Sequence, residues 1–150
     1  KKKNFPVTIL RLYQVYGPNQ DLNRFIPVVI NSCREDLKFP CSNGEQYRDF
    51  LYVDDFVRAV FFSIRNKEAI GKIINIGSGQ PLKIKKIIQN IVTIYNKGKP
   101  LFGKIKLRKE EMRRTYPDIN EAKRLLKWKP KISFKQGILK TVRYYNEDSK

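Results

Sequence analysis

The chain has no histidine, only two cysteines among 150 residues, and few acidic side chains. The absence of histidine excludes a histidine-based triad, a histidine general base and most zinc sites. Cys33 and Cys41 are too few for a disulfide framework and lack metal-ligand spacing, so we expect them to be packing residues. No apolar run approaches the roughly 18 residues of a membrane span, and no N-terminal segment resembles a signal peptide. We therefore expect a cytoplasmic protein that binds neither a metal nor a membrane.

The shortage of acidic residues leaves 32 Lys and Arg against 14 Asp and Glu, a formal net charge of +18. This charge favours anionic ligands and raises the alternative of a basic nucleic-acid-binding domain. The lysines are dispersed, and no RNA-recognition, zinc-finger or KH-type signature accompanies them. We interpret the charge as a solvated surface that suits phosphate-bearing ligands, and expect no nucleic-acid partner.

Strand and helix patterns alternate along the chain, which predicts an α/β fold. Residues 6–13 and 72–76 are apolar and rich in β-branched side chains, as in buried strands of a parallel sheet. Residues 49–53 predict a further short strand.

Helices are predicted between these strands. Residues 25–33 predict a short helix, and residues 84–95 carry apolar side chains at helical spacing. Two capping boxes, Asp118-x-x-Glu121 and Ser133-x-x-Gln136, predict two helices near the end. Asp54 is expected to cap a helix with apolar positions at Phe56, Val57, Val60, Phe61 and Ile64.

Four arginines lie near loops or strand ends: Arg11, Arg24, Arg48 and Arg108. The planar guanidinium fork makes paired hydrogen bonds to phosphate, so such a set suits a diphosphate ligand. A surface ion pair stays open as the alternative for each.

Other polar residues give weaker signals. Residues 77–79, Gly-Ser-Gly, follow a predicted strand but lack the full G-x-G-x-x-G spacing, so a plain strand-to-helix turn is the alternative to a dinucleotide fingerprint. Asp49 is expected to pair with a nearby arginine. Tyr13 and Tyr16 could stack on a ligand ring or pack in the core.

Five segments stand in order along the chain: RLYQVYGP at 11–18, RFIP at 24–27, GEQYRDFLYVDD at 44–55, NIGSG at 75–79, and residues 108–130, which include RRTYPDINEAKRLLKWKP. Together they resemble the extended short-chain dehydrogenases/reductases, the NAD-dependent epimerases and dehydratases of nucleotide sugars. The resemblance covers nearly the whole chain, which departs from the family pattern by Gln14 in place of Asn and by Lys127 in place of Gly. If Lys127 needs left-handed geometry, it costs about 1 kcal/mol.

The resemblance implies a fold and an activity. Residues 1–150 would form the C-terminal part of a Rossmann-type NAD(P)-binding fold, interleaved with the small substrate-binding α/β domain. The family oxidises a nucleotide sugar transiently, usually at C4, by hydride transfer to NAD or NADP, and the full-length protein is expected to be a homodimer. A non-catalytic truncated remnant or a nucleotide-binding module is the alternative.

The family's glycine-rich fingerprint and its Tyr-x-x-x-Lys pair would precede residue 1, so no catalytic residue is expected in this chain. Alone it should be inactive and should expose a long apolar edge.

The resemblance also implies site residues. Arg48 would contact the nucleotide diphosphate or the ribose, Arg108 would clamp the diphosphate, and Glu111 would lie near the ribose. Substrate contacts would also come from Gln14 beside the sugar, Arg24 near the phosphates, Phe39 and Cys41 at the base, and Asn75 near the nucleotide, with Leu12 and Tyr13 at the cofactor.

Overall fold

The structure, a computed structural model, describes residues 5–147. Its strands and helices alternate, which confirms the predicted α/β class. In chain order the elements are β1 (Ile9–Leu12), β2 (Gln14–Tyr16), α1 (Phe25–Arg34), β3 (Lys38–Pro40), β4 (Tyr47–Tyr52), α2 (Val53–Ile64), the 3-10 turn η1 (Lys67–Ala69), β5 (Ile73–Ile76), β6 (Pro81–Lys83), α3 (Ile84–Tyr95), β7 (Lys99–Leu101), β8 (Arg114–Thr115), α4 (Asn120–Leu125) and α5 (Phe134–Glu147).

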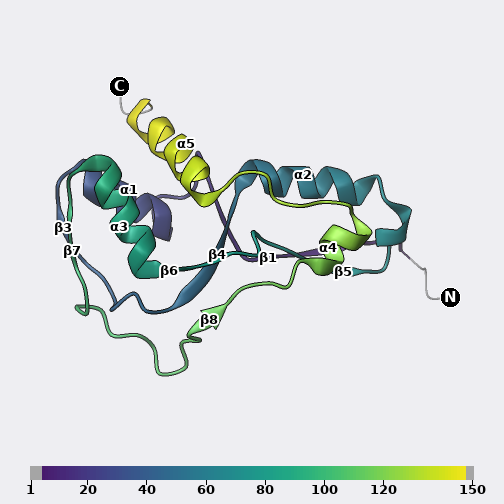
Figure 1. Cartoon of the computed structure of the whole chain (residues 1–150), viewed down its shortest axis with the longest axis horizontal. Helices are drawn as coiled ribbons and strands as arrows, with labels where there is room; N and C mark the ends of the chain where they lie inside the picture. The colour runs from purple at the N-terminus through teal and green to yellow at the C-terminus, as the bar shows by residue number, and fades with distance from the viewer. Residues whose placement is uncertain (1–4, 148–150) are drawn as a thin grey trace.

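Most strand pairs are parallel, and three of the five pairs within residues 5–147 involve β4. Its second half pairs in parallel with β2, where Gln14 lies opposite Phe50. Its first half pairs antiparallel with β6 and parallel with β8, where Arg48 lies opposite Thr115. Separately, β1 pairs in parallel with β5, and β3 with β7. The shared strand β4 therefore joins the two ends of the molecule (Figure 1).

Two apolar clusters form the core. Figure 1 shows α1 and α3 at one end of the molecule, and α2 and α4 with β1 and β5 at the other. The large cluster includes Tyr16, Ile26, Ile30, Cys33, Phe50, Ile87, Ile91, Ile138 and Val142. The small cluster consists of Leu51, Ala59, Ala69, Ile74, Ile76, Ala122, Leu125, Leu126 and Trp128.

Several local predictions are confirmed. The helix expected at 25–33 is α1, which extends by one residue, and the helix expected at 84–95 is α3. The Ser133 capping box forms as predicted, because the Gln136 amide NH donates to Ser133 Oγ at 3.3 Å and the Ser133 amide NH donates to Gln136 Oε1 at 2.9 Å. Lys127 has φ of 51°, the left-handed geometry considered for it.

The predicted start of α2 is wrong. The helix begins at Val53, directly after β4, and its N-cap is Tyr52, which makes no side-chain cap hydrogen bond. Asp54 therefore lies inside the first turn, where its carboxylate pairs with Lys140 Nζ at 3.7 Å. Its charge still favours the positive end of the helix dipole.

The apolar face expected for α2 packs in the core only in part. Phe56 packs against the small cluster, while Val57, Phe61 and Ile64 are 43%, 56% and 74% exposed. The buried residues of the helix are instead Asp55, Ala59 and Ser63, so part of the predicted apolar stripe faces outward.

The second capping box fails in a similar way. Helix α4 begins at Asn120 with Ile119 as N-cap, so the helix does not start at Asp118. Asp118 Oδ1 instead accepts the Asn120 amide NH at 2.8 Å, a bond within a local turn.

The first strand forms but is not buried. β1 pairs with β5 as expected of a parallel sheet, yet Ile9 and Leu12 are 50% and 40% exposed. Among the residues described, β1 has a strand on one edge only, and one face of the β1–β5 pair is uncovered. The expected apolar edge is therefore present.

Candidate functional site

Strand β4 carries the mostly buried guanidinium of Arg48. Its side chain is 13% exposed, Nη1 donates to the Tyr47 carbonyl at 2.7 Å, and Nη2 forms an ion pair with Glu111. The Glu111 amide NH donates to the Arg108 carbonyl at 3.0 Å. Glu111 thus links the segment that contains Arg108 to Arg48.

A first cavity of about 430 Å³ lies beside β2 and the start of α1. Its lining includes Leu12, Tyr13, Gln14, Arg24 and Phe50. The structure therefore brings four of the predicted residues together. Phe50 supplies an apolar wall, while Gln14 and Arg24 supply an amide and a cation that can hydrogen-bond a polyhydroxyl ligand or a phosphate.

A second cavity, also of about 430 Å³, lies beside the start of β4 and β8. It is lined by Asn43, Gln46, Tyr47, Glu111, Arg113 and Arg114, among others. The Arg114 guanidinium lies 5.3 Å from the centroid of the Tyr47 ring, which orients both side chains. Tyr47 and Phe50 are three residues apart on β4, so their Cα atoms are about 10 Å apart along the strand.

Buried polar atoms next to Arg48 have no partner among residues 5–147. They are Thr115 Oγ1, opposite Arg48 in the register of β8, and Gln46 Oε1. Buried polar groups are almost always hydrogen-bonded, so these two atoms indicate a position for a ligand or an ordered water. Gln46, Arg113 and Arg114 were missed as individual site residues, although they lie within the quoted motifs. The signal was the pair Arg113-Arg114 at the start of β8.

Asp49 does not pair with an arginine, contrary to expectation. Its fully buried carboxylate accepts the Ser78 amide NH at 2.6 Å, the Ser78 hydroxyl at 2.8 Å and the Gln80 amide NH at 3.2 Å. Alternation along β4 points Asp49 away from Arg48 and toward the Gly77–Gly79 turn. Asp49 is therefore the acceptor that fixes this turn.

The Gly77–Gly79 turn does not form a phosphate cradle, because two of the amide NH groups that could bind phosphate already donate to Asp49. A Cβ at Gly77 would collide with Pro117, so this glycine serves packing. The cofactor contact expected of Leu12 and Tyr13 stays a prediction.

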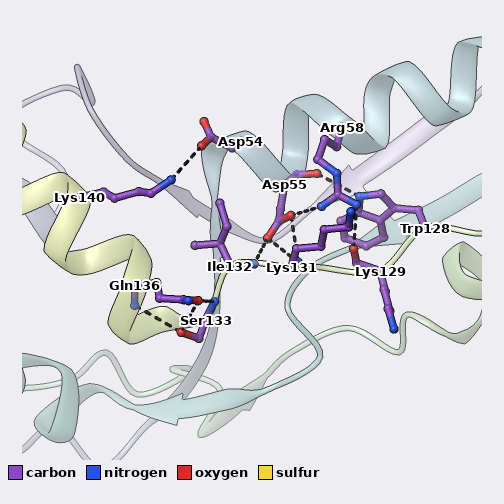
Figure 2. Close-up of polar contacts among 10 residues, drawn as sticks. All are labelled: Asp54, Asp55, Arg58, Trp128, Lys129, Lys131, Ile132, Ser133, Gln136 and Lys140. Carbon is purple, nitrogen blue, oxygen red and sulfur yellow. Dashed lines mark hydrogen bonds and ion pairs between the residues drawn. The ribbon is translucent and has the colours of Figure 1, made fainter.

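A buried carboxylate on α2 fixes the segment that leads into α5 (Figure 2). Asp55 accepts the Lys131 amide NH at 2.9 Å and the Ile132 amide NH at 2.8 Å, and it pairs with Arg58. The Asp55 carbonyl accepts the Trp128 indole NH at 3.1 Å. The chain then reaches Phe134, whose ring stands 6.0 Å from that of Phe50 in the first cavity. Asp55 therefore fixes the segment that packs Phe134 against Phe50.

The remaining predicted site residues are dispersed. Phe39 and Cys41 are buried in the large cluster, so only their backbone could meet a base. Asn75 lies on β5, where its Oδ1 accepts from Arg11 at 3.5 Å and its amide donates to the Asp118 carbonyl at 3.4 Å. Their binding roles stay predictions.

Burial also controls the titrating side chains of the large cluster. Desolvation raises the pKa of the Cys33 thiol to about 11 and raises that of Cys41. Burial, with smaller contributions from Tyr52 and Asp55, raises the pKa of Tyr16, whose hydroxyl donates to the Phe134 carbonyl at 3.2 Å. Both thiols are free and protonated at neutral pH, which fits packing rather than reactive cysteines.

Comparison with known proteins decides the family. The model of the NAD dependent epimerase/dehydratase family matches residues 1–77. The chain belongs to the NAD dependent epimerase/dehydratase family. It is 32% identical over 148 residues to UDP-glucuronate 4-epimerase of Thermodesulfobacterium geofontis, and 31% identical over 153 residues to human dTDP-D-glucose 4,6-dehydratase. These alignments cover 95% and 96% of this chain but 44% and 43% of the relatives, so this epimerase/dehydratase chain spans less than half of their length.

Solved structures agree. The UDP-glucuronic acid 4-epimerase of Bacillus cereus, in complex with UDP-glucuronic acid and NAD, superposes with a TM-score of 0.89 at 31% identity. The superposition covers 97% of this epimerase/dehydratase chain and 47% of the other. The family is NAD-dependent, and the fold is of its Rossmann type.

The family's Tyr-x-x-x-Lys spacing occurs once in this epimerase/dehydratase chain, at Tyr95 and Lys99, although no catalytic pair was expected within residues 1–150. Helix α3 ends at Tyr95, and Lys99 begins β7, so the two side chains do not share a helix face. The Tyr95 hydroxyl donates to Asn146 Oδ1 at 2.9 Å, which gives it a packing role.

Residues 5–147 contain no cluster of three or more potential metal-binding Cys, Asp or Glu side chains. Within the same range, each helix is too short or too polar to cross a membrane.

Proposed function

We propose that this chain is the substrate-binding portion of an NAD(P)-dependent nucleotide-sugar epimerase or dehydratase. The observation that carries the proposal is the position of Arg48, a mostly buried guanidinium on β4 whose ion-pair partner Glu111 lines the second cavity. The bound molecule would be a nucleoside diphosphate sugar, which has an anionic centre between two uncharged ends. The solved relative with UDP-glucuronic acid and NAD supports the same substrate class.

Each part of such a ligand has candidate partners around β4. The diphosphate would bind Arg48 and Arg108, because forked guanidinium groups recognise phosphate oxygens in pairs. The nucleoside would occupy the cavity beside Tyr47, with Glu111 accepting from ribose hydroxyls. The sugar would lie beside Gln14 in the first cavity, with Arg24 near the phosphates.

Other residues have smaller proposed parts. Phe39 and Cys41 would offer backbone atoms to the base, and Asn75 would lie near the nucleotide. Leu12 and Tyr13 would touch the edge of the cofactor. The same proposal includes the division of residues 1–150 into the last Rossmann elements and an interleaved substrate subdomain, a homodimer and a cytoplasmic location. The free thiols of Cys33 and Cys41 support a reducing compartment.

Calorimetric titration with UDP, UDP-glucuronate and dTDP-glucose tests the substrate class. We expect Arg48→Ala to weaken binding at least tenfold, and Arg48→Lys to recover only part of it because lysine lacks the fork. Arg65→Ala is the matched control, because Arg65 is an exposed arginine that lies outside both cavities. Equal losses in Arg48→Ala and Arg65→Ala would mean that only the overall positive charge attracts the nucleotide.

A second measurement separates the binding portion from an active enzyme. Since the catalytic pair is not recognised in this chain, we expect the isolated 150 residues to show no turnover of a nucleotide sugar with NAD. Measurable turnover would overturn this part of the proposal. Preferential binding of DNA, with an affinity that falls linearly with the logarithm of salt, would instead favour a nucleic-acid-binding domain.

A further inference from the structure

Cationic side chains gather at the second cavity. Arg113 and Arg114 line it, and Arg48 is paired with another of its lining residues. The chain as a whole carries a formal net charge of +18. Such a surface attracts every phosphate-bearing molecule, because a positive field acts on charge and not on shape. Charge alone therefore cannot separate a nucleoside diphosphate sugar from pyrophosphate.

Glu111 places a carboxylate among these cations. It lines the cavity, its side chain is 31% exposed, and its Oε1 pairs with Nη2 of the mostly buried Arg48. The other carboxylate in the lining, that of Glu45, is bound to Lys83 Nζ at 2.8 Å and is 54% exposed. Glu111 is thus the acidic residue of the lining that is held against the guanidinium proposed to bind the diphosphate.

The Arg48–Glu111 ion pair opposes a bare anion. Arg48 Nη1 donates to the Tyr47 carbonyl at 2.7 Å and Nη2 donates to Glu111, so a phosphate oxygen at Nη2 has to replace or share the carboxylate. Phosphate and carboxylate are then like charges in a partly buried place, and they repel each other. The displaced carboxylate also needs new donors, because a partly buried charge without partners is costly. Pyrophosphate presents almost only acceptor oxygens, so it cannot supply these donors.

A ribonucleotide carries the missing donors. Ribose has two adjacent hydroxyl groups, and the two oxygens of a carboxylate can accept from both. Hydrogen bonds to an ionised acceptor are stronger than those between neutral groups. A ribonucleoside diphosphate therefore offers an anion to Arg48 and two hydroxyl donors to Glu111, so both charges keep partners when the ion pair opens. A 2′-deoxyribonucleotide offers only one of the two hydroxyls.

Backbone bonds, and not the Glu111 side chain alone, hold this segment to β4. The Tyr47 amide NH donates to the Arg113 carbonyl at 2.8 Å, and Arg48 lies opposite Thr115 in the register of β8. The Glu111 amide NH donates to the Arg108 carbonyl at 3.0 Å. A neutral side chain at position 111 leaves these bonds in place, so the charge of Glu111 can be removed without detaching the segment.

We propose that Glu111 is a specificity-determining residue that selects ribonucleoside diphosphates and rejects bare anions and 2′-deoxyribonucleotides. This inference rests on the proposed function and names the nucleotide class within it. On binding, the diphosphate takes the place of the carboxylate on Arg48, and the carboxylate accepts from the ribose hydroxyls. Selection arises from the cost that Glu111 imposes on the wrong anion as well as from its bonds to the right one.

Calorimetric titration of the 150-residue chain with pyrophosphate, UDP and 2′-deoxyuridine diphosphate (dUDP) tests the selection. Glu111→Gln removes the charge and keeps the size of the side chain. Glu110→Gln is the matched control, because it changes the net charge equally at an exposed neighbouring carboxylate. We expect UDP to bind the wild type about tenfold more tightly than pyrophosphate and about fivefold more tightly than dUDP. Glu111→Gln should bind pyrophosphate about fivefold more tightly than the wild type does and should bring both preferences close to one, whereas Glu110→Gln should preserve them.

A shorter carboxylate provides a second variant. Glu111→Asp keeps the charge, so we expect it to raise the affinity for pyrophosphate less than Glu111→Gln does. An affinity for pyrophosphate that stays unchanged in Glu111→Gln, or rises equally in Glu110→Gln, would overturn the inference. Equal affinities of the wild type for UDP and dUDP would do the same.

The titrations also separate this inference from the proposed function. UDP binding that depends on Arg48, with preferences that Glu111→Gln does not change, defeats the selection by Glu111 and leaves the proposed function intact. A wild type that binds none of the nucleotides defeats both.

Discussion

The two ends of the molecule differ in how completely they bury their apolar residues. At the α1–α3–α5 end, helices and strands enclose the large cluster, and Ile30, Cys33 and Ile91 are fully buried. At the β1–β5 end, the small cluster covers one face of a two-stranded sheet and leaves Ile9 and Ile73 half exposed. The α1–α3–α5 end is therefore closed by its own helices and strands, while the β1–β5 end is covered on one face only.

Asp55, which ties α2 to the segment before α5, should be the position where a substitution lowers stability most. Asp55→Ala leaves two backbone NH groups and Arg58 without their shared acceptor, and we expect it to lower the free energy of unfolding by about 4 kcal/mol. Asp54→Ala is the matched control, since Asp54 is 55% exposed and its ion pair with Lys140 is worth about 0.5 kcal/mol (Figure 2). Urea denaturation measures both; similar losses would refute the anchoring role of Asp55.

Neighbouring isoleucines on β5 test how far the small cluster extends. Ile74 is fully buried and Ile73 is 49% exposed. We expect Ile74→Ala to cost about 3 kcal/mol through lost burial and a cavity, and Ile73→Ala to cost less than about 1 kcal/mol. Thermal or urea unfolding of the pair gives the difference. A large loss for Ile73→Ala in the isolated chain would mean that the uncovered face is already packed.

Gly137 in α5 tests how tightly side chains pack around the large cluster. Gly→Ala inside a helix normally stabilises it by about 1 kcal/mol. At Gly137, however, a Cβ would collide with the Tyr16 hydroxyl and press against the Tyr52 ring. We expect Gly137→Ala to destabilise the chain by about 2 kcal/mol. Gly137→Ala combined with Tyr16→Phe should recover part of that loss, and an unchanged or raised unfolding midpoint in the single variant would contradict the proposed contact.

Helices and strands could be predicted from the sequence where local signals agree with the tertiary contacts. Periodicity located α3 with its observed bounds, and the Ser133 capping box located the start of α5. The prediction failed where a distant partner decides the outcome. Asp49 and Asp55 both bind backbone NH groups from segments 29 or more residues away, which no pattern around residues 49–55 reveals.

The candidate site shows the same limit. Arg48 and Glu111 were proposed separately from the resemblance, and their ion pair forms only because β8 aligns residues 114 and 115 beside β4. The exposed positions of α2, Phe61 and Ile64, were predicted as buried for a related reason. An apolar pattern shows that a surface can be buried, but not whether a partner within residues 5–147 covers it.

The smallest expected effect is a pH dependence of the free energy of unfolding that arises from Cys33 in the large cluster. Burial raises the pKa of Cys33 from its ordinary value of 9.0 to about 11, so the folded state keeps the neutral thiol while the unfolded chain ionises first. The stability that the buried neutral thiol contributes is complete below pH 9 and is lost as the pH rises through 11. About 1 kcal/mol of it is lost by pH 10. Urea titrations at pH 8 and pH 10 of the wild type and Cys33→Ala measure it as the difference between their pH slopes. Identical slopes would mean that Cys33 is open to solvent and that the large cluster is less closed than the β1–β5 end.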